Sequence, residues 1–228
     1  MRVHRSFAFI DLSGFTALTE SGGDEYAVSV LTAFRTLVRN ICSRRGVRIA
    51  KWLGDGAMLV GVETTPLLAT VLEIEFAAER SPERFDIRCG VTAGDVILHE
   101  GDDYIGHAVN VAARLCDLAN GGHVLGTPAV VDELPLWGAV LNTDDIVVRG
   151  LENKLRVMRI GFKALHGTAV PDPVCGIPLT KEVATISTKD SLGREMWFCS
   201  DSCRDTWERR PEPPADELGS PRRPLIGY

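Results

Sequence analysis

Two aspartates stand where a metal site could form. Asp11 and Asp55 each follow an apolar segment and lie close to glycines. Apolar segments of this length are typical of buried strands, and glycine lets the chain turn tightly beside the acid. A carboxylate in such a place is costly unless something compensates its charge. Two of them on neighbouring strands would form a site for one or two divalent cations.

A helix expected over residues 107–120 carries a polar pair on one face. Asn110 and Arg114 are four residues apart, so they lie on the same side of that helix, while its apolar residues can be buried. Arginine can hold a phosphate through two donors, and asparagine can orient a hydroxyl or a ring oxygen. The pair therefore indicates a phosphorylated ligand, with a hydrogen-bonded pair in a dimer interface as the alternative.

The segment Gly14-Phe15-Thr16 follows Asp11 and predicts a turn. The backbone N–H groups of such a turn could cradle phosphate oxygens. Carboxylates, a phosphate-binding turn, an arginine and a lysine are together the groups that phosphoryl transfer requires.

Strands and helices alternate before residue 165. We expect strands at 7–11, 47–53, 57–62, 86–93, 96–100, 140–148 and 155–161, and helices at 24–42, 67–80, 107–120 and 128–134. The second and third strands form a hairpin with Gly54-Asp55-Gly56 at its turn. This order predicts an α+β sandwich with a mostly antiparallel sheet.

The composition excludes several classes of protein. The chain has 228 residues and a formal net charge of −6, which does not suggest a nucleic-acid binder. No segment reaches the roughly 18 apolar residues of a membrane span, and the N-terminus has no signal-peptide pattern. We therefore expect a cytoplasmic protein with reduced cysteines. Cys42, Cys89 and Cys116 are expected to be buried thiols.

Three blocks resemble the catalytic domain of class III nucleotidyl cyclases. They are FIDLSGFT (residues 9–16), KWLGDG (51–56) and DYIGHAVNVAARL (103–115), and the resemblance extends over roughly residues 5–162. It implies a ferredoxin-like βαββαβ sandwich over residues 1–165. It also implies that Asp11 and Asp55 bind two Mg²⁺ or Mn²⁺ ions, and that Gly14, Phe15 and Thr16 bind the phosphates of the substrate.

The resemblance also assigns the base-selecting residues. Lys51 and Asp103 fall at the purine-selecting positions, and this combination is similar to that of adenylyl cyclases, whereas guanylyl cyclases usually have Glu and Cys. Adenine offers an acceptor at N1 and a donor at N6, which suits a lysine and an aspartate. Asn110 corresponds to the residue that orients the ribose, and Arg114 to the one that stabilises charge on the α-phosphate.

The implied function is that of an adenylate cyclase that converts ATP to 3′,5′-cyclic AMP and pyrophosphate by in-line attack of the ribose 3′-hydroxyl, in intracellular signalling. Both sets of residues occur in one domain, so the resemblance implies a head-to-tail homodimer with two shared sites. Two alternatives stay open: a guanylate cyclase or one of mixed selectivity, and a catalytically silent nucleotide-binding or metal-sensing scaffold. The further phosphate-binding cation is also open between Arg149 and Lys154.

A second, smaller module is expected over residues 171–212. Its motifs DPVCG (172–176) and WFCSDSC (197–203) resemble a YHS domain, a metal-associated module related to TRASH domains. Cys175, Cys199 and Cys203 would supply soft thiolates that favour zinc or copper(I). The fourth ligand stays open between Asp201, water and none, and a metal-free, reduced module is the alternative. Residues 213–228 are expected to be a disordered tail.

Overall fold

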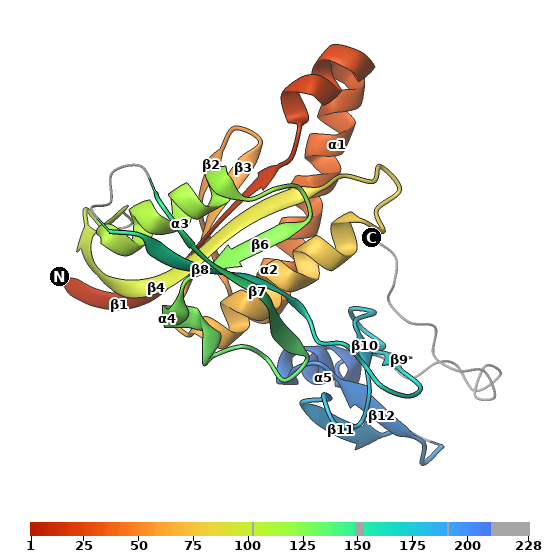
Figure 1. Ribbon diagram of the computed structural model, residues 1–228. Helices are drawn as coiled ribbons and strands as arrows, with labels where there is room; N and C mark the ends of the chain where they lie inside the picture. Colours follow the sequence, from red (N-terminus) through yellow and green to blue (C-terminus); the bar gives the residue numbers. More distant parts are fainter. Residues whose placement is uncertain (102, 149–152, 191, 211–228) are drawn as a thin grey trace. The chain divides into compact units, whose positions relative to one another are not determined.

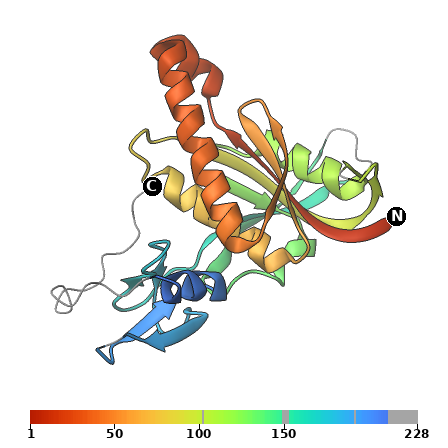
Figure 2. The same ribbon diagram turned by 180° about the vertical axis from the view of Figure 1, so that it is seen from behind.

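The computed structural model describes residues 1–101, 103–148, 153–190 and 192–210. The chain divides into two compact units (Figures 1 and 2). The first comprises Met1–Leu134 and Gly138–Phe162, and the second Pro135–Trp137 and Lys163–Tyr228. The predicted tail, residues 213–228, lies outside the described residues.

One eight-stranded sheet forms the centre of the first unit. Its order is β2-β3-β1-β4-β6-β8-β7, and β5 pairs with β4. The strands are β1 (Arg2–Leu12), β2 (Arg48–Leu53), β3 (Gly56–Gly61), β4 (Ile87–His99), β5 (Asp103–Ile105), β6 (His123–Gly126), β7 (Gly138–Ile146) and β8 (Leu155–Phe162). The first four strands are antiparallel in the order β2-β3-β1-β4, which is the ferredoxin-like arrangement. The predicted α+β class is therefore confirmed.

Helices cover both faces of this sheet. In Figures 1 and 2, α1 (Phe15–Arg45) and α2 (Thr64–Ala78) lie on one face and α3 (His107–Leu118) on the other, with the short α4 (Pro128–Val131) after β6. Side chains along β1 point alternately to the two faces of the sheet, so both faces carry apolar residues that a helix can cover. Phe7 belongs to the cluster that contains Ala108 and Ala112 of α3, whereas Ala8 and Ile10 are buried on the opposite face.

Four elements differ clearly from the sequence prediction: the short strands β5 and β6 were not expected, and α1 and β4 have other bounds. α1 begins at Phe15 instead of residue 24, and Gly23, with a φ of 78°, kinks it. The polar residues before the kink hid the helical periodicity. β4 is one strand instead of two, because β1 pairs with it without interruption: Arg5 opposes Gly94 and His4 opposes Asp95. This pairing satisfies the backbone hydrogen-bonding groups of the residues where a turn was expected.

The second unit is built from short elements. They are β9 (Val170–Pro171) paired with β10 (Pro178–Leu179), β11 (Ile186–Lys189) paired with β12 (Glu195–Phe198), and α5 (Asp201–Glu208). Trp137, which directly precedes β7, is part of this unit's core. Its side chain is 1% exposed, and its Nε1 donates to the carbonyl oxygen of Cys199 at 3.0 Å.

In the part of the chain that the structure describes, no helix combines the length and the apolar character needed to cross a membrane.

The backbone of α3 packs directly on β4 at Gly90. A Cβ atom at this position would lie 2.2 Å from the carbonyl oxygen of Ala112 and 2.3 Å from the amide nitrogen of Cys116. Because these are backbone atoms, the helix itself would have to move. We expect Gly90→Ala to lower the free energy of unfolding by about 1–3 kcal/mol, as for other overpacked sites.

The measurement is urea denaturation, with Gly94→Ala as the matched control on the same strand. A Cβ atom at Gly94 would meet only the Cβ of Ala108, at 3.2 Å. We expect a clearly smaller loss for that variant. Equal losses in the two variants would contradict the close packing of α3 at Gly90.

Candidate active site and thiol cluster

The fold brings Asp11 and Asp55 to the same end of the sheet. Asp11 is the last residue but one of β1 and the register partner of Gly56 in β3, while Asp55 occupies the turn between β2 and β3. The amide of Leu12 donates to the carbonyl oxygen of Asp55 at 3.3 Å. A Cβ atom on Gly56 would lie 2.9 Å from Oδ1 of Asp11, so a glycine is needed there for the carboxylate to keep its place.

Arg88 is a site residue that the sequence analysis missed. It is the register partner of Asp11 on β4, and its Nε and Nη2 donate to Oδ2 of Asp11 at 2.9 and 2.6 Å. The side chains are 33% exposed for Arg88 and 20% for Asp11. Only the pairing register of β1 with β4 reveals this contact, because the two residues are 77 positions apart.

The acid pair carries more negative charge than Arg88 compensates. Burial raises the pKa of Asp11, the hydrogen bond from Arg88 lowers it, and the charges of Asp55 and Asp117 raise it; the net direction is upward. A further positive charge would therefore stabilise the ionised form of Asp11. Carboxylate oxygens are ligands that Mg²⁺ and Mn²⁺ prefer, so the residues present fit a divalent cation.

The predicted phosphate-binding turn is the N-terminus of α1. Gly14 adopts the left-handed conformation, with a φ of 70°, and precedes the first helical residue, Phe15. The amide of Ser13 donates to the carbonyl oxygen of Asp86 at 2.9 Å, which fixes the start of the turn. The first backbone N–H groups of a helix have no partner within it, and together with the helix dipole they attract anions. Thr16 is exposed at this end.

Lys51 and Asp103 form an ion pair. The Nζ of Lys51 on β2 lies 2.7 Å from Oδ1 of Asp103 on β5, and the side chains are 45% and 50% exposed. The hydrogen bond from Lys51 lowers the pKa of Asp103. The amide of Tyr104 also donates to Oδ1 of Asp103, and its ring packs edge-on against Phe7 at 5.4 Å. The pair is therefore set on the α3 face of the sheet.

Asn110 and Arg114 are both exposed on α3. Arg114 Nη1 lies 3.7 Å from Oδ2 of Asp117, one helical turn further on. Among the described residues, no hydrogen bond or ion pair joins Asn110 or Arg114 to the acid pair. Of the two candidates for a further phosphate-binding cation, Arg149 lies outside the described residues and Lys154 is exposed before β8.

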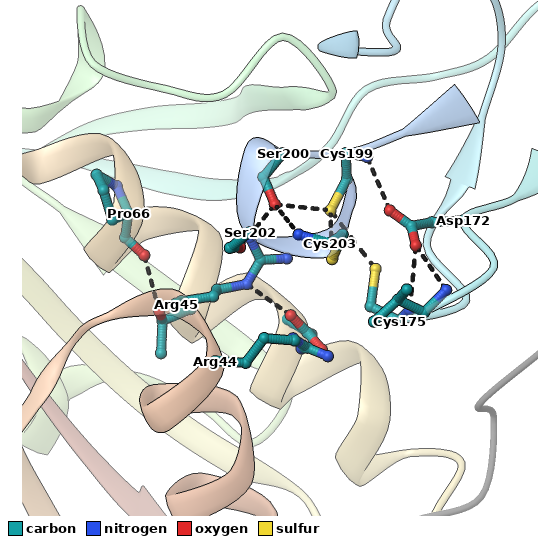
Figure 3. A network of polar contacts seen from close by, with 12 residues as sticks. Arg44, Arg45, Pro66, Asp172, Cys175, Cys199, Ser200, Ser202 and Cys203 are labelled. Atoms are coloured by element: carbon teal, nitrogen blue, oxygen red, sulfur yellow. Dashed lines mark hydrogen bonds and ion pairs between the residues drawn. The ribbon is translucent and has the colours of Figure 1, made fainter. Parts of the chain in front are cut away.

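A cluster of metal-ligating side chains occupies the second unit (Figure 3). Asp172, Cys175, Cys199 and Cys203 are all buried, and one ligand atom of each lies within 4.8 Å of the others. The Sγ of Cys199 is 3.5 Å from that of Cys175 and 3.6 Å from that of Cys203, and none of the three cysteines is in a disulfide within the described part of the chain. Around a tetrahedral zinc with bonds of about 2.3 Å, sulfurs stand about 3.8 Å apart. The cluster therefore fits such an ion closely.

Asp172 holds the two cysteine segments together. Its Oδ1 accepts from the amides of Val174 and Cys175 at 2.8 and 3.2 Å, and its Oδ2 accepts from the amide of Cys199 at 2.8 Å (Figure 3). Burial raises the pKa of Asp172 to about 7. From the sequence alone, the fourth ligand is open between Asp201, water and none. The carboxylate in the cluster is instead Asp172, which the spacing alone did not place beside Cys199, 27 positions away.

Known proteins that resemble this chain in sequence or in structure include nucleotide cyclases. A pH-sensitive adenylate cyclase of Mycobacterium tuberculosis is 34% identical over 181 residues, covering 74% of this chain and 44% of that protein. The guanylyl cyclase Cya2 superposes with a TM-score of 0.64 at 18% identity, covering 72% of this chain and 94% of its own. The adenylyl cyclase CyaB of P. aeruginosa gives 0.61 at 20% identity, with 72% and 96% coverage.

No protein-family model matches the chain. The chain spans less than half the length of the curated relatives that it matches. The solved structures show a common fold, and the sequence relatives include proteins named adenylate cyclase. The fold of the first unit is thus that of adenylyl and guanylyl cyclase catalytic domains, and the comparisons support a class III adenylate/guanylate cyclase catalytic domain in this chain.

Proposed function

We propose that the first unit is an adenylate cyclase that converts ATP to 3′,5′-cyclic AMP and pyrophosphate. The observation that carries the proposal is the occurrence, on one cyclase fold, of the adjacent acids Asp11 and Asp55 together with the ion pair of Lys51 and Asp103. Sequence relatives named adenylate cyclase support the same activity.

The acid end of the sheet would hold the polyphosphate. Asp11 and Asp55 would bind two Mg²⁺ or Mn²⁺ ions, which when bound lower the pKa of the ribose 3′-hydroxyl and neutralise phosphate charge. The N–H groups of the turn at Gly14, Phe15 and Thr16 would bind the leaving pyrophosphate. Arg88, already beside Asp11, would have donors available for a phosphate oxygen once cations share that carboxylate.

The α3 face would bind the nucleoside. Lys51 can donate to N1 of adenine, and Asp103 can accept from its N6 amino group, so the ion pair would open to receive the base. Asn110 would orient the ribose. Arg114, exposed on the same helix, would stabilise the charge that develops on the α-phosphate.

A head-to-tail homodimer would complete each site. Asn110 and Arg114 point from α3 to solvent, and among the described residues nothing links them to Asp11. Two copies could therefore meet so that the acids of one chain face the arginine of the other. In such a dimer each chain would contribute to two equivalent sites.

Turnover and subunit mixing test this function. Purified protein with Mn²⁺ or Mg²⁺ should form cyclic AMP from ATP faster than cyclic GMP from GTP, as followed by chromatography. Asp55→Asn and Arg114→Ala should each lose about 10²–10³ in rate. Mixed in equal amounts, the two variants should recover roughly one quarter of the natural activity, because half of the dimers would carry one intact site.

A mixture of Asp55→Asn with Asp11→Asn is the matched control, because every site then lacks one acid and no recovery is expected. Recovery in that mixture, or none in the first, would contradict shared sites. Faster turnover of GTP would establish the guanylate cyclase alternative, and no cyclic product from either nucleotide would establish the silent scaffold.

We propose as a second function that the cluster of Asp172, Cys175, Cys199 and Cys203 binds one zinc or copper(I) ion. Its support is the closeness of four buried ligand atoms, which together satisfy a tetrahedral ion. Thiolates favour these soft ions over magnesium or calcium. A small unit of short strands would also gain stability from a bound metal.

The amount of metal that the chain retains tests whether this cluster is a metal site. The full chain, dialysed after zinc or copper(I) loading, should retain about one ion, and Cys199→Ser should retain almost none. Tryptophan fluorescence should change on loading, because Trp137 donates to the carbonyl of Cys199. Cys42→Ser is the control, since Cys42 is a buried thiol in α1. Equal metal content in both variants would contradict the site.

A further inference from the structure

A cavity of about 630 Å³ opens in the first unit between the end of α3, the strand β6 and the hairpin of β7 and β8. Leu118, Leu125 and Val157 are among its apolar lining residues. None of the residues proposed above for cyclase chemistry lines it. Its volume lies within the range of about 300–1,000 Å³ that is usual for small-molecule sites.

Arg159 brings a positive charge into this cavity. Its Nη1 lies 3.2 Å from Nε2 of His123, and because arginine only donates, the histidine nitrogen must accept. The Nε of Arg159 is buried and has no hydrogen-bond partner. Within the described part of the chain, no carboxylate forms an ion pair with Arg159. A half-buried guanidinium with an unused donor is costly, and an anionic ligand would relieve that cost.

The other polar groups restrict the charge of the ligand. Asp144 also lines the cavity, but it is exposed, and its Oδ2 accepts from Nδ2 of Asn142 at 2.7 Å. A carboxylate at the rim disfavours a ligand with several negative charges. One anionic head at Arg159 and an apolar body against the leucine and valine side chains fit the lining best.

We propose that this cavity binds a small amphiphilic monoanion, with its carboxylate or sulfate head on Arg159. The apolar body would pack on Leu118, Leu125 and Val157. Because Leu118 lies one helical turn beyond Arg114 on α3, the ligand would touch the helix that carries the polar pair. The binding itself does not depend on the proposed cyclase activity.

Calorimetric titration of the full chain tests the proposal with four probes. Octanoate and octyl sulfate carry the singly charged head and the body, 1-octanol lacks the charge, and acetate lacks the body. We expect saturable binding of one octanoate or octyl sulfate per chain, about 10- to 100-fold tighter than 1-octanol or acetate. The tighter of the two anions identifies the head group. Octanol binding as tightly as both anions, or no saturable binding, would overturn the proposal.

Arg159→Gln should weaken binding of the better anion by about 10- to 100-fold. Arg156→Gln is the matched control, because Arg156 lies on the same strand but is exposed and pairs with Asp145 at 3.0 Å. Equal affinities of the two variants would overturn the assignment of Arg159. If Arg159→Gln does not fold, the comparison of octanoate with 1-octanol on the natural chain decides whether the charged head group contributes to binding.

A second copy of the chain is the competing occupant. Sedimentation at saturating octanoate distinguishes the two, because a cavity filled by a partner subunit would release that subunit when the anion binds. An unchanged oligomeric state supports the ligand site, and anion-driven dissociation would overturn it.

Discussion

The burial of the Asp11 carboxylate beside a second acid at the end of one sheet is the constraint on which the proposed chemistry depends. Asp11 and Asp55 are brought together by backbone pairing that admits only a glycine at position 56. Arg88 compensates part of their charge, yet burial still raises the pKa of Asp11. A site that is stable without ligand but favours additional positive charge is suited to recruit cations together with a polyphosphate.

The remaining groups are held by rigid elements around that end of the sheet. The contact of α3 with the backbone at Gly90 sets the height of the helix above β4 and therefore the positions of Asn110 and Arg114. Lys51 and Asp103 neutralise each other in the free chain, so the pair that we propose selects the base is held in place by its own contact. Each group is thus positioned by sheet pairing or helix packing instead of by a flexible loop.

How far the sequence predicts this arrangement depends on whether a feature is local. Most of the strands and helices and the polar pair on α3 follow from periodicity, and the motif blocks imply the cyclase fold. The short strands β5 and β6 were not expected. Arg88 could not be found, because its role depends on the register between β1 and β4. Asp172 was likewise missed as the fourth member of the thiol cluster, and nothing in the composition placed Trp137 in the second unit. Those contacts are made across long separations in the chain, which single-sequence patterns do not encode.

The most direct measurement is Mn²⁺ binding to the full chain in the presence of a non-reactive ATP analogue, followed by electron paramagnetic resonance of the free ion. If Asp11 and Asp55 jointly hold the metal, the natural chain should bind Mn²⁺ saturably, and Asp11→Asn should weaken that binding by at least about 10-fold. Glu79→Gln, which changes an exposed acid at the end of α2, should leave it unaltered. Equal Mn²⁺ affinity in the natural chain and in Asp11→Asn would contradict the account.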